Sequence, residues 1–99
     1  MNLINKFKFK NIKFDFKDNI GELILYYFKF KPSKKHIKYA KLKDLENYNE
    51  SCFQLYIVYD KNNKIYKYGY MQYILNDGEV LELKQLNKSE IDYIKNNIL

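Results

Sequence analysis

The residues best suited to chemistry in this chain are few and isolated. His36 is the single histidine and Cys52 the single cysteine among 99 residues. A catalytic thiol needs a base within hydrogen-bond reach, and no flanking motif beside either residue indicates such a pair. Cys52 begins an apolar segment, which is more typical of a small core residue. We therefore expect no nucleophilic catalysis and no enzymatic activity.

Metal and phosphate sites lack their residues as well. A structural zinc site needs about four Cys, His or carboxylate ligands, more than one histidine and one cysteine supply. The segment DKNNK from Asp60 begins like a calcium loop but lacks the glycine and glutamate that such a loop needs further on. Gly21, Gly69 and Gly78 stand alone, so no glycine-rich phosphate loop is present. We expect neither a metal nor a cofactor.

Length and composition indicate one small domain, residues 1–99, with 46% hydrophobic residues. The longest apolar run, Leu23 to Phe28, is far shorter than the roughly 20 residues of a membrane helix. The start of the chain, MNLINKFKFK, has no apolar stretch typical of a signal peptide. A single cysteine suits a reducing compartment. These features predict a cytoplasmic protein without a membrane segment.

Residue periodicity predicts an α+β fold. An antiparallel β-meander over about residues 52–85 is predicted by the segments CFQLYIVYD, IYKYGYMQYIL and EVLELKQL, which KNNK and NDGE separate. Asp-Gly is a strong signal for a tight hairpin turn. Asn87 and Glu90 have the spacing of a capping box, so a C-terminal helix is expected over about residues 88–98.

The N-terminal half is expected to add further strands and a helix. FKFKNIKFDFK alternates like a strand, with a phase shift that predicts a bulge or turn at Lys10-Asn11. Residues 20–30 read either as a buried strand or as a helix. The capping-box spacing of Asn19 and Glu22 favours the helix, which Pro32 would end. The segment HIKYAKL alternates like a strand again.

A hairpin turning at Asn62-Asn63 would pair Tyr59 with Tyr66, Ile57 with Tyr68 and Leu55 with Tyr70. Cross-strand partners share a face, so this register places Tyr66, Tyr68 and Tyr70 in the core. A second hairpin at Asp77-Gly78 would pair Ile74 with Leu81. The opposite face would then carry a mixed aromatic and basic patch, typical of an interface core: Tyr56, Lys67, Met71, Tyr73 and Lys84. The alternative is that the N-terminal half packs over this patch as a second core layer.

The charge is distributed unevenly over a net +6. Residues 1–43 carry twelve lysines and three acids, whereas residues 44–99 carry six lysines and nine acids. A basic half can bind a polyanion. The candidate nucleic-acid contacts are Lys31, Lys34, Lys35, Lys38, Tyr39, Lys41 and Lys43. Without arginine, such binding would be weakly sequence-specific and strongly salt-dependent.

Asn, Ile, Lys, Phe and Tyr make up 59 of the 99 residues. Their codons are rich in A and T, so an AT-rich bacterial genome or mobile element would explain much of the lysine and tyrosine content. Elimination leaves two hypotheses. The first is a stoichiometric binder of a partner protein, of the inhibitor, immunity or anti-defence kind, with a homodimer also compatible. The alternative is a basic nucleic-acid-binding protein.

Overall fold

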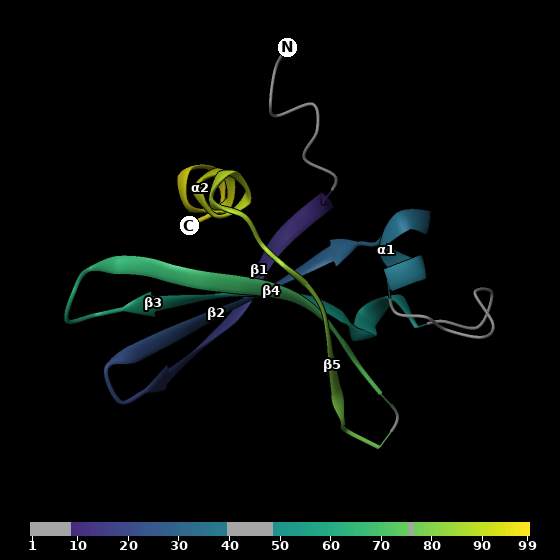
Figure 1. Ribbon diagram of the computed structural model, residues 1–99, viewed down its shortest axis with the longest axis horizontal. Helices are drawn as coiled ribbons and strands as arrows, with labels where there is room; N and C mark the ends of the chain where they lie inside the picture. The colour runs from purple at the N-terminus through teal and green to yellow at the C-terminus, as the bar shows by residue number, and fades with distance from the viewer. Residues whose placement is uncertain (1–8, 40–48, 76) are drawn as a thin grey trace, which may run out of the picture.

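The centre of the protein is a sheet of five antiparallel strands that follow one another in chain order (Figure 1). The computed structural model describes residues 9–39, 49–75 and 77–99. The strands are β1 (Lys10–Ile20), β2 (Leu23–Lys31), β3 (Phe53–Asp60), β4 (Ile65–Ile74) and β5 (Val80–Gln85). The remaining elements are α1 (Lys34–Tyr39), the 3-10 turn η2 (Glu50–Cys52) and α2 (Lys88–Asn97). The α+β class, the antiparallel meander and the C-terminal helix are confirmed.

The helix favoured for residues 20–30 is wrong, because this segment forms a hairpin turn and a central strand. Ile20 pairs with Leu23 across Gly21 and Glu22, and Gly21 adopts a φ of 59° that favours glycine. Residues 23–28 then pair with β1 on one side and β3 on the other. A central strand with apolar residues on both faces gives a continuous apolar run, which periodicity alone cannot distinguish from a buried helix.

The alternating segment after Pro32 begins with α1 rather than a strand. Ser33 caps this short helix, because its carbonyl accepts from the Ile37 amide at 3.0 Å and its hydroxyl from the His36 amide at 3.4 Å. His36 is buried and stacks on Phe9 with 4.9 Å between ring centroids. The histidine is therefore a core residue.

The bulge predicted at Lys10-Asn11 is confirmed. The β1–β2 register shifts between Lys10 and Lys13, and Asn11 has a φ of 56°. A second shift lies between Phe14 and Phe16, which the sequence did not indicate. Two bulges in one strand bend it, and the second places Phe14 and Phe16 on opposite faces.

The β3–β4 hairpin begins in the predicted register and then departs from it. Tyr59 pairs with Tyr66, but the next pair is Val58 with Tyr68, so Lys67 is an extra residue in β4. Beyond the bulge, Leu55 pairs with Met71 and Ile57 with Gly69. A slip of one residue moves every later side chain to the other face.

The core position predicted for Tyr66 is therefore correct, whereas those predicted for Tyr68 and Tyr70 are wrong. Tyr66 packs against the core, and Tyr70 pairs with Tyr56 on the opposite face. The second hairpin differs by one residue as well, since Ile74 pairs with Val80 rather than Leu81.

Gly69 is the residue that the displaced register requires. A Cβ atom at this position would lie 2.7 Å from the backbone oxygen of Tyr56 and 3.0 Å from Leu86 Cδ1. The Gly69 carbonyl also accepts a hydrogen bond from the Leu86 amide at 2.8 Å. Only glycine leaves room for this close approach of β4 to Tyr56 of β3 and to Leu86.

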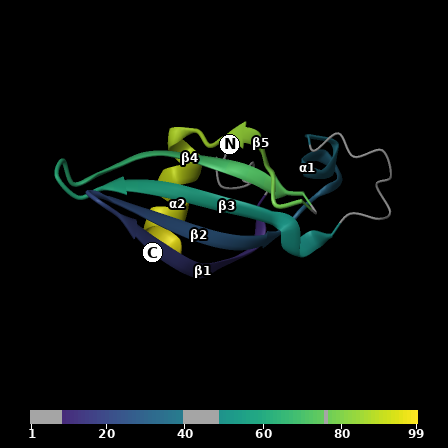
Figure 2. The same ribbon diagram turned by 90° about the horizontal axis from the view of Figure 1, so that it is seen from below.

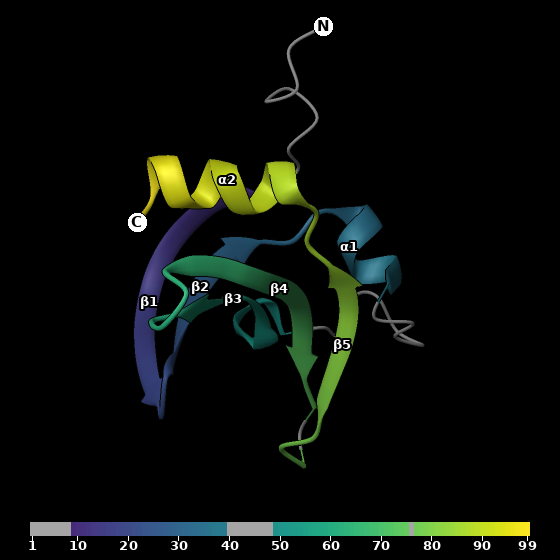
Figure 3. The ribbon, with the colours of Figure 1, turned by 60° about the vertical axis from the view of Figure 1, so that its left-hand side comes forward.

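Helix α2 covers one face of the sheet, as Figures 1 and 3 show. Asn87 and Glu90 form the predicted capping box, with both hydrogen bonds at 2.9 Å. Figure 2 views the sheet from the other side, with the strands in front of α2. The core between helix and sheet is contiguous. Its fully buried side chains include Phe28, Phe53, Leu55, Ile57, Met71 and Ile94.

Candidate interaction surface

The five residues predicted to form a partner-binding patch lie on different sides of the sheet. Met71 and Tyr73 have exposed fractions of 0% and 7%, so they are core residues rather than parts of an exposed patch. Lys84 lies on the helix-covered side, where its ammonium bonds Glu90 at 2.9 Å. Tyr56 and Lys67 are the two members on the open face. The bulge at Lys67 is the cause, because it exchanges the faces of the residues that follow.

The residues predicted to contact nucleic acid are only partly described. Lys31 ends β2 with an exposed side chain, and Lys34 and Lys38 are exposed on α1. Lys35 and Tyr39 belong to α1, and their side-chain surroundings are not described. Lys41 and Lys43 lie outside the described residues.

The open face of the sheet carries a row of aromatic side chains that crosses four strands. Phe16 of β1 stacks on Tyr27 of β2 with ring centroids 4.5 Å apart. Tyr27 lies 5.9 Å from Tyr56 of β3, and Tyr56 stacks on Tyr70 of β4 at 5.8 Å. Tyr68 adds an edge contact to Tyr70 at 5.9 Å. We call these five residues the aromatic row.

The ring geometry determines what the aromatic row presents to a ligand. Neighbouring strands lie about 4.8 Å apart. Phe16 and Tyr27 are almost parallel, at 14°, and are separated by nearly this distance. Rings stacked from strand to strand stand upright on the sheet, so their edges and hydroxyl groups face outward. In the two stacked pairs, Phe16–Tyr27 and Tyr56–Tyr70, one face of each ring is occupied by its neighbour, so fewer ring faces remain for stacking of a flat ligand.

A hydrogen bond holds the row at its side, because the Tyr56 hydroxyl donates to Glu82 of β5 at 3.3 Å. Next to the row, Gln72 donates to its cross-strand partner Gln54 at 3.0 Å. Burial, and secondarily the Glu82 carboxylate, raises the pKa of Tyr56. Burial, with Asp18 as a second cause, raises the pKa of Tyr27. Both phenols are therefore neutral at physiological pH and can donate hydrogen bonds.

The two ends of the open face differ in character. Beyond the aromatic row toward the β1–β2 turn lie Leu25 and the exposed Ile20. At the other end, Lys13 pairs directly with Lys29 and Lys10 with Lys31. Like charges placed opposite each other destabilise a sheet. Within the described residues, none of these four lysines has an acidic partner within 4.0 Å.

The outer strands of the sheet are poorly suited to pairing with another chain. β1 is interrupted by two bulges and is exposed along most of its length. β5 has six residues and its own register shift. Bulges, lysines and short edge strands are common protections against edge-to-edge association. The face, rather than the outer edges, is the surface on which a partner would find broad contact.

The sequence did not identify Phe16, Tyr27, Tyr68 or Tyr70 as surface residues. One signal was available, because an isolated glycine in a strand indicates a bulge or a close backbone approach. Gly69 is such a glycine, two residues beyond the bulged Lys67. Placing a bulge beside it would have brought Tyr68 and Tyr70 to the side of Tyr56.

Within the described ranges, no group of three or more His, Cys, Asp or Glu side chains is arranged to hold a metal ion. No helix in the same ranges is long and apolar enough to cross a membrane. Comparison of the chain with models of protein families, with curated proteins and with solved structures finds no match.

Proposed function

We propose that this protein binds a partner protein stoichiometrically through the open face of its sheet. The observation that carries the proposal is the aromatic row, which forms a continuous surface across four strands on the side away from α2. Tyrosine is enriched in interface cores because it combines apolar area with a hydroxyl group. The proposed setting is the bacterial cytoplasm, with an inhibitor or immunity role.

Rigidity of the aromatic row supports this proposal. Each ring is held by at least one other ring, and Tyr56 is further held by Glu82. Side chains that are already ordered lose little conformational entropy when a partner covers them. The row can therefore contribute most of its burial energy to binding.

The matched pair Phe14 and Phe16 gives a sharp test. Both residues are in β1 and both have an exposed fraction of 46%, but only Phe16 belongs to the aromatic row. Phe14 lies instead beside Phe28, on the helix-covered side. The two variants Phe16→Ser and Phe14→Ser thus remove similar exposed apolar area from opposite faces.

We expect affinity purification from the native host, after nuclease treatment and high-salt washing, to retain a partner with the wild type and with Phe14→Ser. Phe16→Ser should lose that partner while its thermal unfolding remains cooperative. Equal retention by both variants, or equal loss, would contradict binding through the open face. Nucleic acid that co-purifies at low salt without nuclease treatment, with no protein partner left after the nuclease and high-salt steps, would favour the second candidate function.

That second candidate is nucleic-acid binding, favoured by the lysine pairs Lys13–Lys29 and Lys10–Lys31. A phosphate backbone would relieve their mutual repulsion. Lys13, Lys29 and Lys31 also line a shallow hollow of about 370 Å³ together with Ser51. Because the rings of the aromatic row stack on one another, bases would gain little stacking energy, and phosphate contacts would dominate.

Fluorescent oligonucleotides, single-stranded and duplex, test this second function. Binding at about 50 mM salt should weaken steeply as salt rises, and Lys29→Gln should reduce both the affinity and the salt slope. Lys17→Gln removes the same charge from a residue that pairs with Tyr26, and it serves as the control. Absence of binding at low salt would rule the function out.

A further inference from the structure

The first half of β4 has a strand neighbour on only one side among the described residues. β5 pairs with β4 from Tyr70 to Ile74, and the Leu86 amide adds one bond to the Gly69 carbonyl. The chain then turns away into α2. Residues 65–68 pair with β3 alone. The position beside this half-strand is the one that a longer β5 would occupy.

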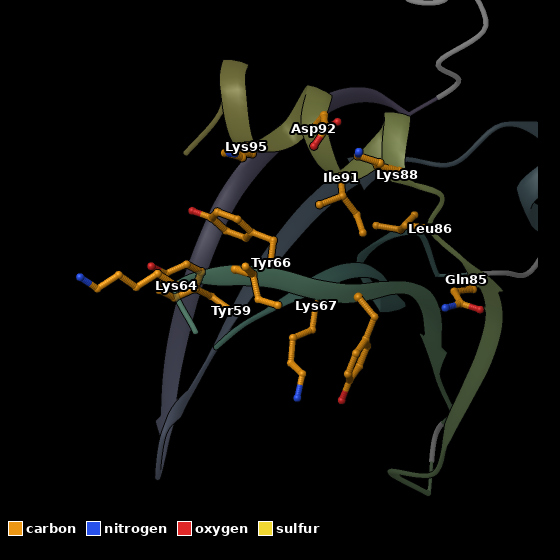
Figure 4. A pocket seen from close by; sticks show the side chains of 12 residues that line it. Tyr59, Lys64, Tyr66, Lys67, Gln85, Leu86, Lys88, Ile91, Asp92 and Lys95 are labelled. Carbon is orange, nitrogen blue, oxygen red and sulfur yellow. The ribbon is translucent and has the colours of Figure 1, made fainter. Parts of the chain in front are cut away.

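A groove lies beside this open half-strand, bounded by α2 above it (Figure 4). Its volume is about 660 Å³. Tyr66 from β4, Leu86 from the β5–α2 connection and Ile91 from α2 contribute apolar lining. Figure 4 shows Tyr66 and Ile91 lying in the space between strand and helix. The groove thus combines a strand edge with an apolar wall.

The charges around the groove are mainly positive. Lys64, Lys88 and Lys95 line it, with Asp92 as the acidic residue among its lining. No ion pair within 4.0 Å involves these three lysines in the described part of the chain. The Lys95 ammonium lies 5.6 Å from the centre of the Tyr66 ring. A ligand that carries carboxylates would therefore be attracted to this groove.

Lys67 also lines the groove, but its side chain points away from α2 in Figure 4 and its ammonium lies 3.7 Å from Asp60. Asp60 in turn accepts hydrogen bonds from Asn62 and Asn63, and the Asn63 side-chain bond is the main cause that lowers the pKa of its carboxyl group. The turn network thus holds the bulged lysine away from the open edge.

We propose that this groove binds an extended acidic segment of a partner protein, which adds to the sheet as a strand beside residues 65–68 of β4. Main-chain hydrogen bonds to the open edge would supply affinity, and the three lysines would select carboxylate side chains. The edge spans about 13 Å at roughly 3.3 Å per residue, which accommodates a segment of four to five residues. This inference goes beyond the open face and does not depend on it.

The probe is a fluorescein-labelled octapeptide of alternating Glu and Val, measured by fluorescence anisotropy and by amide chemical shifts of the ¹⁵N-labelled protein. We expect saturable binding, with the largest shifts at residues 65–68. The same peptide with Lys in place of Glu should not bind. A third peptide, with alternate amides N-methylated, retains the carboxylates but cannot pair as a strand, so it should bind at least tenfold more weakly.

Variants of the lining lysines locate the site. Lys64 has a φ of 55°, so Lys64→Gly removes the charge without straining the backbone. Lys64→Gly and Lys95→Gln should each weaken binding by about two- to fivefold, the range for exposed charge pairs. Lys29→Gln, with the same change in net charge on the open face, should have no such effect. Phe16→Ser should also leave peptide binding unchanged, which separates this site from the aromatic row.

Three outcomes would overturn the proposal. Equal binding of the N-methylated peptide would show an anion site without strand addition. Binding that Lys29→Gln weakens as much as Lys95→Gln would show general attraction to a basic protein. Concentration-dependent dimerisation without peptide, abolished by Lys64→Gly in sedimentation experiments, would assign the edge to a second copy of this chain.

Discussion

The two faces of the sheet contain similar residues but stabilise them in different ways. On the helix-covered face, Phe28, Leu55 and Met71 are fully buried and contact the same core as Ile94 of α2. On the open face no helix in the described ranges supplies such cover (Figure 2). There the rings of the aromatic row pack sideways against one another instead. Burial between layers serves stability, and sideways stacking keeps apolar surface ordered while leaving it accessible.

The largest expected change in stability comes from truncating Met71. The sequence predicts this residue in the partner-binding patch, but it lies in the core. Met71→Ala should lower the free energy of unfolding by about 2–5 kcal/mol, since it leaves a cavity in a fully buried site. Tyr70→Ala, one residue away on the open face, should cost about 0.5–1.5 kcal/mol through lost ring contacts. Urea denaturation of both variants measures the difference, and a larger cost for Tyr70→Ala would contradict the observed register.

A smaller effect is expected from Gly69→Ala, which tests the close approach on the helix-covered face. The added methyl group meets the Tyr56 backbone oxygen and the Leu86 side chain. Overpacking of this kind costs about 1–3 kcal/mol. Gly78→Ala in the β4–β5 turn meets no atom within 4 Å and probes the positive φ of 87° alone. Thermal denaturation of Gly69→Ala that matches the wild type would show that the strand has room for a side chain.

Much of the fold could be predicted because it depends on local signals. The Asn87–Glu90 capping box and the bulge at Lys10-Asn11 involve residues close in sequence, and both are found in the structure. A hairpin also forms at Asp77-Gly78, although its pairing is displaced by one residue. The face of each β4 residue could not be predicted from its alternation alone. It depends on one inserted residue, Lys67, whose position is set by pairing with β3 and by the approach of Leu86 to Gly69.

The prediction of the candidate site was affected most by the unpredicted bulge at Lys67. A register displaced by one residue exchanges the two faces, so alternation without a bulge predicts Met71 and Tyr73 on the surface and Tyr68 and Tyr70 in the core. Near the turn, before the bulge, the assignment of Tyr66 was correct. For residues 20–30, the capping-box spacing of Asn19 and Glu22 was outweighed by pairing of β2 with strands on both sides. Both wrong predictions, the faces of the β4 residues and the helix over residues 20–30, thus concern features that are set by pairing between strands.

Titration of Tyr56 tests how well its ring is buried on the open face. Its raised pKa keeps the folded phenol neutral above the ordinary value of about 10, where the unfolded phenol ionises. This contribution to stability is fully present below about pH 10 and is lost as pH rises toward the folded pKa. Glu82→Gln should lower the pKa of Tyr56 but leave it above the ordinary value, because burial is the larger cause. The ¹³Cζ shift of Tyr56 against pH measures this.

Complete return of the Tyr56 pKa to its ordinary value in Glu82→Gln would show that the ring is not desolvated by its neighbours. The aromatic row would then be looser than the centroid distances indicate. An unchanged pKa would instead show that the hydroxyl does not contact Glu82 in solution. Either result would weaken the view that the open face is ordered without a helix to cover it.

The smallest effect is expected at the basic end of the open face. Lys29 pairs directly with Lys13, so Lys29→Glu replaces a repulsive cross-strand pair with an attractive one. The free energy of unfolding should rise by about 0.2–1 kcal/mol, and the gain should shrink in high salt. Lys17→Glu, which lies opposite Tyr26 rather than a lysine, should show no comparable gain. A gain in both variants would reflect the lower net charge of a basic chain. A gain confined to Lys29→Glu would show that repulsion between Lys13 and Lys29 lowers the stability of this end of the sheet. A surface that binds anions would require such a group of neighbouring lysines.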